Sequence, residues 1–364
     1  MKVLISTDTV GGVLTYTAEL AAALAAQGDE VVVATMGPRL RPEQRELLPP
    51  KVHESGCRLE WMDDPWEDVA AAGRWLLALE EAERPDLVHL CSFSHAALPF
   101  RAPKLVVAHS CVLSWWRAVH GTEAPPSWDR YREETGAGLA AADTVIAPTQ
   151  SILRELERDH DLPAGRTAVI HNGTPMPTGR KYPYTEGNRP VAGEKEALIL
   201  GSGRFWDPAK NLAALDAAAA GLQWPVVVAG DLQCGEPPRH ATSAGVLEPA
   251  QLAELRRRAS IYAAPALYEP FGLGILEAAA ERCALVLGDI PSLRELWSDA
   301  AIFVDPRDPE ALREALAGLA SDRWLRSALA DRAQRRAASY SIDRAAHAYH
   351  RLYECLAATA EVAA

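Results

Sequence analysis

The chain has 364 residues, 48% hydrophobic and 24% charged, with a formal net charge of −12. This length suits two domains with separate cores, and the composition is typical of a soluble globular protein. The acidic balance disfavours nucleic acid as a partner. No apolar run approaches the ~18–20 residues that cross a bilayer, so no transmembrane segment is expected.

Local signals along the chain also indicate its compartment. Met1 leads into Ser6 without the apolar region of a signal peptide, which predicts a cytoplasmic protein. The cysteines are scattered and form no Cys-x-x-Cys pair, which fits neither a disulfide framework nor a zinc site. We therefore expect reduced thiols in the core, at Cys57, Cys91, Cys111, Cys234, Cys283 and Cys355.

Short apolar runs alternate with helical patterns in the first half of the chain. Runs that are apolar throughout indicate strands covered on both faces, so the alternation predicts a parallel sheet wrapped by helices. The predicted strands are residues 2–6, 31–35, 87–90, 104–108, 144–147 and 168–170, and the predicted helices are 15–27, 68–83 and 151–158.

A change of composition divides the chain. Residues 176–195 are dominated by Pro, Gly, Tyr, Thr, Arg and Asn and show no periodic apolar pattern, and a second alternating series follows. We therefore predict a first Rossmann-like domain over 1–178, a linker over 179–196 and a second Rossmann-like domain over 197–342. Its predicted strands are 197–200, 225–229, 261–264, 285–287 and 301–304, and its helices include 252–258 and 309–320. A cleft between two such domains is where ligand sites concentrate.

Two carboxylates stand eight positions apart at Glu269 and Glu277. Pro270 and Gly272 favour a turn, and the residues from Ile275 onward favour a helix. The start of a helix attracts an anion, and carboxylates accept hydrogen bonds from sugar and ribose hydroxyls. The junction therefore predicts a ligand that is part phosphate and part polyol, such as a sugar nucleotide. The alternative is a buried turn with a surface glutamate at each end.

Glu269-x7-Glu277 with Pro-Phe-Gly-Leu inside it resembles the donor-site signature of retaining glycosyltransferases of family four. The resemblance implies the GT-B fold, an α/β architecture of two Rossmann-like parallel-sheet domains facing across a cleft. It also implies a C-terminal helix, 343–364, that crosses back to the first domain. In such an enzyme Glu269 would hold sugar hydroxyls and Glu277 the ribose diol. The remaining donor-binding residues implied in this domain are Gly203, Val246, Leu247, Phe271, Gly272 and Leu273.

Two cations follow the first strand of the second domain. Arg204 offers a bidentate fork and Lys210 a point charge, a suitable pair for a diphosphate, and six positions around a proline-containing turn let both reach one anion. The family pattern has Gly after this lysine, where this chain has Asn211, a departure that affects the turn more than the chemistry. In isolation, two solvated surface cations are the alternative.

Two elements of the first domain complete the predicted site. Gly11, Gly12 and Val13 follow the first strand, where glycines let a ligand approach the backbone. They resemble the Gly-Gly-Val turn that faces the diphosphate in family-four enzymes. His109 ends a strand, at a position where relatives often have a histidine that contacts the donor sugar, although a strand-end histidine is commonly a satisfied core residue. We do not assign it as a general base.

Ten tryptophans are many for this length. Trp115, Trp116 and Trp128 fall in a loop-rich stretch after His109, and aromatic faces stack well on sugars. Core packing is the alternative for any one of them. As a group they are the predicted acceptor-binding residues.

These features predict a retaining glycosyltransferase that moves a hexose from a nucleotide-diphosphate sugar, UDP-sugar preferred, to a hydroxyl of a soluble small-molecule or saccharide acceptor. Residues 1–180 carry a net charge of −8 and the remainder −4, unlike the basic acceptor domains of relatives that act on lipids. Arg204 and Lys210 would stabilise the leaving diphosphate without a metal, by front-face attack. No cofactor is expected, because the sugar nucleotide is a co-substrate.

Rival functions are a sugar-nucleotide epimerase or phosphorylase of the same fold, a non-catalytic sugar-nucleotide sensor, and a nicotinamide oxidoreductase. No lysine stands out as a pyridoxal anchor, which disfavours a glucan phosphorylase. The missing Gly-x-Gly-x-x-Gly fingerprint disfavours the oxidoreductase. The oligomeric state is not predicted.

Overall fold

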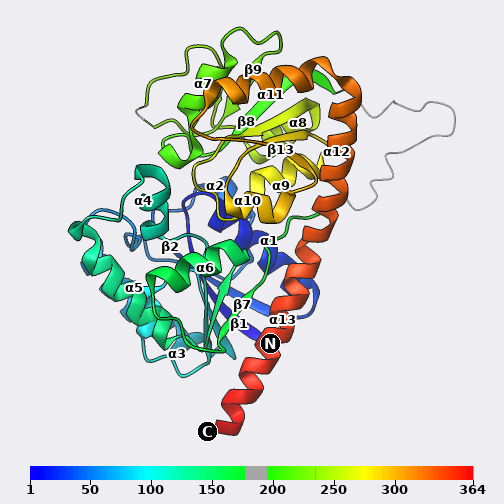
Figure 1. The fold of residues 1–364 in the computed structure, drawn as a ribbon. Helices are drawn as coiled ribbons and strands as arrows, with labels where there is room; N and C mark the ends of the chain where they lie inside the picture. Colours follow the sequence, from blue (N-terminus) through cyan, green and yellow to red (C-terminus); the bar gives the residue numbers. More distant parts are fainter. Residues whose placement is uncertain (177–194, 234, 364) are drawn as a thin grey trace, which may run out of the picture. The chain divides into compact units, whose positions relative to one another are not determined.

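The computed structural model describes residues 1–176, 195–233 and 235–363. It divides into two compact units, Met1–Gly173 together with Ile342–Ala364, and Thr174–Ser341 (Figure 1). The predicted linker 179–196 lies almost wholly outside the described residues. The predicted fold class, two α/β domains with parallel sheets, is confirmed.

Unit 1 is built on a seven-stranded parallel sheet of order β3-β2-β1-β4-β5-β6-β7. Six of its strands coincide with predicted ones to within two residues at each end. The additional strand β3 is only three residues long and is not buried, so it leaves no apolar run in the sequence. The strands are β1 (Lys2–Asp8), β2 (Glu30–Met36), β3 (Val52–Glu54), β4 (Leu87–Leu90), β5 (Lys104–Val107), β6 (Thr144–Ala147) and β7 (Thr167–Val169).

Helices join these strands and cover the sheet. The first begins at Gly12 rather than near residue 15, directly after Gly11, whose φ of 80° favours glycine. The helices of unit 1 are α1 (Gly12–Ala26), α2 (Pro42–Glu46), α3 (Trp66–Glu83), α4 (Val112–His120), α5 (Asp129–Ala141), α6 (Gln150–Asp159) and α13 (Ile342–Ala363), with 3₁₀ turns η1 (Ser94–Ala97) and η2 (Pro126–Trp128).

The C-terminal helix α13 packs against α1 and β4 of unit 1 (Figure 1). Its Tyr353 hydroxyl lies 2.7 Å from Nδ1 of His89 on β4, and both side chains are fully buried. The ring of Tyr349 lies 5.3 Å from that of His89. The last 22-residue helix is therefore an integral part of the first core.

Acidification should destabilise unit 1 through His89. Burial lowers the pKa of His89 to about 3, so below the ordinary value near 6.5 the unfolded chain binds a proton that the folded chain does not. His89 therefore contributes its full stabilisation above pH ~6.5 and loses it as pH falls towards 3, at about 1.4 kcal/mol per pH unit. Hydrogen exchange of the β4 amides between pH 7 and 5 should show a loss of stability in which His89 alone accounts for about 2 kcal/mol. His89→Gln, which does not titrate, should flatten this slope, and an unchanged slope would contradict the assignment.

Unit 2 is built on a six-stranded parallel sheet of order β10-β9-β8-β11-β12-β13. All five predicted strands are present. The additional strand β10 has the sequence Thr-Ser-Ala-Gly and is partly exposed, so it too lacks an apolar run. The strands are β8 (Glu196–Ser202), β9 (Val226–Ala229), β10 (Thr242–Gly245), β11 (Ala259–Ala264), β12 (Ala284–Gly288) and β13 (Ala301–Val304).

The central strand β8 shows how this sheet is covered on both faces. Leu200 joins an apolar cluster with Leu276, whereas its neighbour Ile199 joins a second cluster with Leu316. Successive side chains of a strand point to opposite faces, so the run is apolar throughout. The helices of unit 2 are α7 (Leu212–Ala219), α8 (Pro249–Arg258), α9 (Leu273–Ala280), α10 (Pro291–Trp297), α11 (Pro309–Ser321) and α12 (Arg323–Ala337), with 3₁₀ turns η3 (Pro208–Lys210) and η4 (Ala338–Tyr340).

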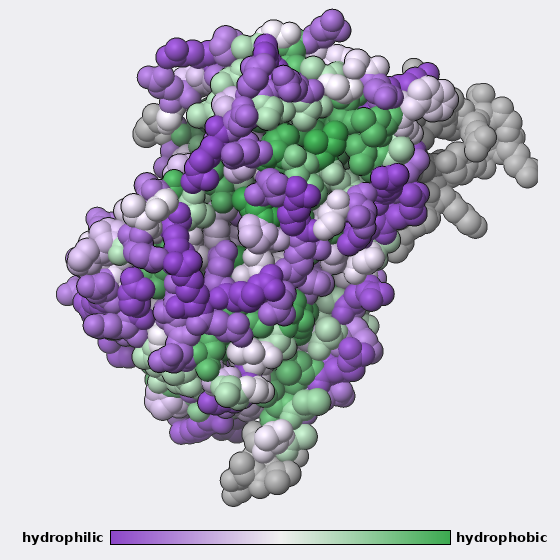
Figure 2. Space-filling model, in the orientation of Figure 1, coloured by the Kyte–Doolittle hydropathy of each residue, from purple (hydrophilic) through white to green (hydrophobic). Residues whose placement is uncertain are grey.

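The face shown in Figure 2 is largely hydrophilic, with apolar side chains gathered in patches. None of the described helices combines the length and the apolar character needed to cross a bilayer. The five cysteines among the described residues are free thiols. Cys111 and Cys283 are buried as expected, Cys57 and Cys91 are half-buried, and Cys355 is exposed on α13. The remaining cysteine, Cys234, lies outside the described residues.

Candidate functional site

The loop that follows β8 carries the predicted cations of unit 2. Arg204 lies 4.0 Å from Asp207, with its guanidinium over the ring of Trp206 at 5.4 Å from the centroid. Asn211 adopts left-handed backbone geometry, φ 55° and ψ 47°, and its side-chain amide donates to the carbonyls of Pro265 and Pro306 at 2.9 and 2.6 Å. Asparagine tolerates this conformation better than most residues. Asn211 therefore anchors the turn, in line with the expectation that asparagine in place of the family's glycine affects the turn more than the chemistry.

Lys210 and Glu269 meet directly. The Nζ of Lys210 lies 2.6 Å from Oε2 of Glu269, and less than a fifth of either side chain is exposed. The amide of Leu267 donates to the carbonyl of Ala209 at 2.8 Å, which ties the loop after β11 to the loop after β8. Both loops leave the carboxyl ends of adjacent parallel strands, so residues 59 positions apart become neighbours.

The start of α9 lies immediately after Glu269. Gly272 is the N-cap with φ 85°, and a Cβ there would lie 2.7 Å from Cδ1 of Ile275, so glycine is required. The helix begins at Leu273, not at Ile275, and no side chain in the described part of the chain caps it. Its first N–H groups therefore remain available to an anion. The Phe271 side chain is buried against Tyr340, so only its backbone can face a ligand.

Glu277 lies one turn into α9 and pairs with a residue that the sequence analysis did not identify. Its Oε2 lies 2.8 Å from Nη1 of Arg256, at the end of α8, and the two side chains are 22% and 10% exposed. Burial raises the pKa of the Glu277 carboxyl, and the Arg256 charge opposes this shift. Arginine runs such as 256–258 are usually solvent-facing, so nothing in the sequence distinguishes this one.

The charges of Glu269 and Glu277 both act on Tyr262, a buried residue of β11. Burial and the charges of Glu277 and Glu269 raise its pKa to about 12, against the opposing effects of Ser202 and Arg256. Its hydroxyl lies 2.8 Å from Oγ of Ser202, the last residue of β8. Both carboxylates therefore lie within the electrostatic environment of one tyrosine at the carboxyl edge of the sheet.

The predicted base-binding residues follow β10. Gly245 has φ 65°, Val246 exposes 60% of its surface, and Leu247 packs against the apolar cluster that contains α9. An exposed valine beside an anchored leucine offers an apolar surface to a flat ring.

Unit 1 has a hollow of about 50 Å³ at the carboxyl ends of its strands. Ligands of open parallel sheets bind at this edge. Val13 and His109 of the predicted set line it, together with residues that the prediction did not include: Asp8, Met36, Arg58, Leu59, Glu60, Trp61, Cys91, Ser92, Phe93, His95, Ser110, Val112 and Tyr131. These residues come from many separate segments, so no local pattern marks the hollow.

His109 is neutral in this hollow. Burial lowers its pKa to about 3, and its Nε2 is buried without a hydrogen-bond partner among the described residues. Its ring lies edge-on to Tyr16, with centroids 4.4 Å apart. An unpaired buried imidazole nitrogen is costly unless a ligand satisfies it.

The three predicted acceptor tryptophans do cluster. Trp115 and Trp116 lie on α4, not in a loop, and Trp128 ends η2. Trp116 contacts Trp115 and Trp128 at ring-centroid distances of 6.1 and 6.5 Å and packs on His120 at 4.3 Å. None of the three lines the hollow around His109.

Comparison with known families follows the same division of the chain. Residues 10–176 match the model of Glycosyltransferase Family 4, and residues 188–336 match that of Glycosyl transferases group 1. The chain therefore has two successive regions that match glycosyltransferase domain models. Together the matches support a glycosyltransferase with the GT-B fold.

Curated relatives match part of the chain. A phosphatidyl-myo-inositol mannosyltransferase of Mycolicibacterium smegmatis is 31% identical over 206 residues, 52% of each chain. A D-inositol 3-phosphate glycosyltransferase of Corynebacterium urealyticum is 27% identical over 242 residues, 59% of this chain and 57% of the relative. The chain spans about half the length of the curated relatives it matches.

Solved structures share the fold over the whole chain. Sucrose-phosphate synthase from Thermosynechococcus elongatus superposes with a TM-score of 0.77 and 19% identity, covering 99% of this chain and all of the other. Anabaena HepE, solved in complex with UDP-glucose, gives 0.76 and 16%, covering 98% and 100%. At such identities the likeness shows the fold alone.

Proposed function

We propose that this protein is a retaining glycosyltransferase that transfers a hexose from a UDP-sugar to a hydroxyl of a small soluble or saccharide acceptor, by front-face attack and without a metal. The observation that carries the proposal is the direct pairing of Lys210 with Glu269 beside the uncapped start of α9. It places an ammonium, a carboxylate and free N–H groups within one loop-to-helix junction.

The chemistry follows from these groups. As the sugar leaves its diphosphate, negative charge grows on the bridging oxygen, and Lys210, Arg204 and the first N–H groups of α9 stabilise it. Glu269 accepts hydrogen bonds from the sugar hydroxyls, and Glu277 from the ribose diol. The departing phosphate takes the acceptor's proton. The acceptor hydroxyl attacks the anomeric carbon on the face that the phosphate leaves, so the anomeric configuration is retained without an enzyme-linked sugar.

The hollow of unit 1 has room for a single small polar group and is our candidate for binding one hydroxyl or phosphate of the acceptor. Neutral His109 presents an unpaired nitrogen there, and the Asp8 and Glu60 side chains also line it. The names of two relatives specify an inositol phosphate and a phosphatidyl-inositol substrate. Inositol phosphates are therefore the first acceptors to test, and UDP-glucose, the ligand of HepE, the first donor.

Glu277→Gln should weaken UDP binding about 10- to 100-fold, because hydrogen bonds to a charged group stabilise by about 1.5–3 kcal/mol. Isothermal titration with UDP measures the change. Since burial raises the Glu277 pKa, wild-type affinity should fall on acidification at a higher pH than for an ordinary carboxylate. Glu254→Gln is the matched control, because Glu254 also pairs with an arginine of α8 but is half exposed. Equal affinities in both variants would refute the ribose assignment.

Product analysis with a labelled UDP-sugar separates the alternatives. A glycoside with the donor's anomeric configuration, determined by NMR, supports the proposal, and an inverted product contradicts it. An epimerised sugar without transfer indicates an epimerase of the same fold. Binding of UDP with neither transfer nor donor hydrolysis indicates a non-catalytic sugar-nucleotide-binding protein.

A further inference from the structure

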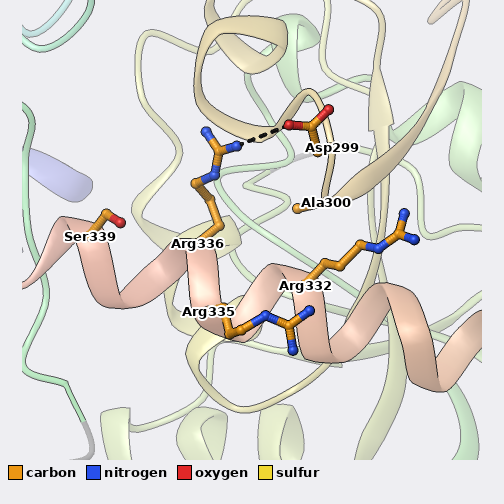
Figure 3. Close-up of a pocket in the computed structure, with 6 residues that line it drawn as sticks. All are labelled: Asp299, Ala300, Arg332, Arg335, Arg336 and Ser339. Carbon is orange, nitrogen blue, oxygen red and sulfur yellow. Dashed lines mark hydrogen bonds and ion pairs between the residues drawn. The ribbon is translucent and has the colours of Figure 1, made fainter.

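A second hollow, of about 270 Å³, lies on unit 2 between α12 and the turn before β13 (Figure 3). It is lined by Asp299, Ala300, Arg332, Arg335, Arg336 and Ser339. Arg336 points from α12 to Asp299, whereas the Arg332 and Arg335 side chains extend from the same helix in other directions. None of these residues belongs to the proposed donor site.

The hollow is positively charged in an acidic protein. Its three arginines are spaced i, i+3 and i+4, which places like charges together on one helix face at a cost in stability. Asp299 is the one carboxylate that lines the hollow; it lies 3.4 Å from Arg336 and is 84% exposed. Arg332 and Arg335 have no side-chain partner among the described residues. The residues that line the hollow therefore carry a net positive charge, because one carboxylate faces three guanidinium groups.

Parallel topology separates this hollow from the donor residues. Asp299 and Ala300 directly precede β13, so they lie at the amino edge of the sheet, whereas Gly203 and Glu269 follow β8 and β11 at the carboxyl edge. Likewise, Gln334 of α12 donates to the carbonyl of Ala280, the last residue of α9, while the donor residues surround the start of that helix. The hollow is therefore separate from the predicted donor residues.

We propose that this hollow binds a phosphate monoester at a site separate from that of the sugar nucleotide. Guanidinium forks match phosphate oxygens bidentately, and Arg332 and Arg335, which pair with no carboxylate among the described residues, offer two such forks at the hollow. The volume suits a phosphate with a small organic body rather than a nucleotide sugar. The phosphate comes from a free phosphate ester or from the headgroup of a lipid.

The test follows the arginine side-chain N–H resonances during titration with inorganic phosphate and glycerol 3-phosphate. Resonances that disappear in Arg332→Gln and Arg335→Gln should shift with saturation in the wild-type protein. The double variant should bind phosphate at least about tenfold more weakly at this site, and more salt should weaken wild-type binding. Arg323→Gln is the matched control, since Arg323 is an exposed arginine of the same helix outside the hollow.

Vesicle sedimentation distinguishes the two sources, with phosphatidylcholine vesicles with and without phosphatidic acid. Shifts with the soluble phosphates support the site with a free ester as its ligand. Sedimentation with phosphatidic acid that the double variant loses supports it with a lipid headgroup. If the resonances stay fixed at millimolar phosphate and the variant sediments like the wild type, the proposal is overturned. Neither measurement depends on sugar transfer, so the phosphate site can be refuted without refuting the proposed glycosyltransferase function.

Discussion

Lys210→Ala should lower kcat by a factor of 10² to 10³, because removing one preorganised group that stabilises the leaving charge costs about 3–4 kcal/mol in the transition state. The fold should survive, since the Lys210–Glu269 pair is only partly buried and its loop is also held by Asn211 and by the Leu267–Ala209 hydrogen bond. Steady-state transfer from UDP-glucose, with thermal unfolding of the same sample, measures both effects.

Lys51→Ala provides the control for losing an ion pair. Lys51 lies 2.6 Å from Glu30 in unit 1, the same separation as in the Lys210 pair, but both partners are half exposed and outside any proposed site. This variant should keep its turnover. Near-normal turnover of Lys210→Ala would rule out our assignment of the leaving-group site.

Gly230→Ala should destabilise unit 2 by about 3 kcal/mol or more and abolish donor turnover. A Cβ at Gly230 would lie 1.8 Å from the carbonyl oxygen of Gly203. The backbone φ of Gly230 is 151°, a value that residues with a side chain rarely adopt. The atoms of Gly203 that the Cβ would meet belong to the backbone, so no side-chain rotation can relieve the clash. Relief requires displacement of the Gly203 turn, which leads into the loop that carries Arg204 and Lys210. Urea denaturation and UDP-glucose turnover measure the two effects.

Gly221→Ala separates the clash from the cost of the backbone conformation. Gly221 also has a positive φ, 78°, but nothing lies within 4 Å of its would-be Cβ. We expect a loss of only ~1–2 kcal/mol and unchanged turnover. If both variants lost equal stability, close packing of Gly230 on Gly203 would not be what requires glycine there.

Elements marked by a short stretch of sequence were predicted better than elements that depend on contacts with distant residues. Strands β4, β6 and β13 match the predicted bounds, because an apolar run between turn residues is sufficient to identify a buried strand. Strands β3 and β10 were missed, since a short or exposed strand owes its existence to pairing with a neighbour. Helix α4 lies in the stretch that the sequence analysis predicts to be rich in loops, although its apolar residues recur at the i, i+3, i+4 and i+7 spacing of a helix, at Val112, Trp115, Trp116 and Val119.

The sequence by itself determined the two α/β domains, the turn at Gly11 and the position of Glu269 and Glu277 around the start of α9. Each of these depends on residues within one short segment, where glycine geometry and apolar periodicity act directly. Only the tertiary structure decided that Lys210 meets Glu269, that Arg256 pairs with Glu277 and that α12 and the turn before β13 enclose an arginine-lined hollow. Those pairings arise from the order of strands in a parallel sheet, which brings together residues tens of positions apart and leaves no trace in local spacing.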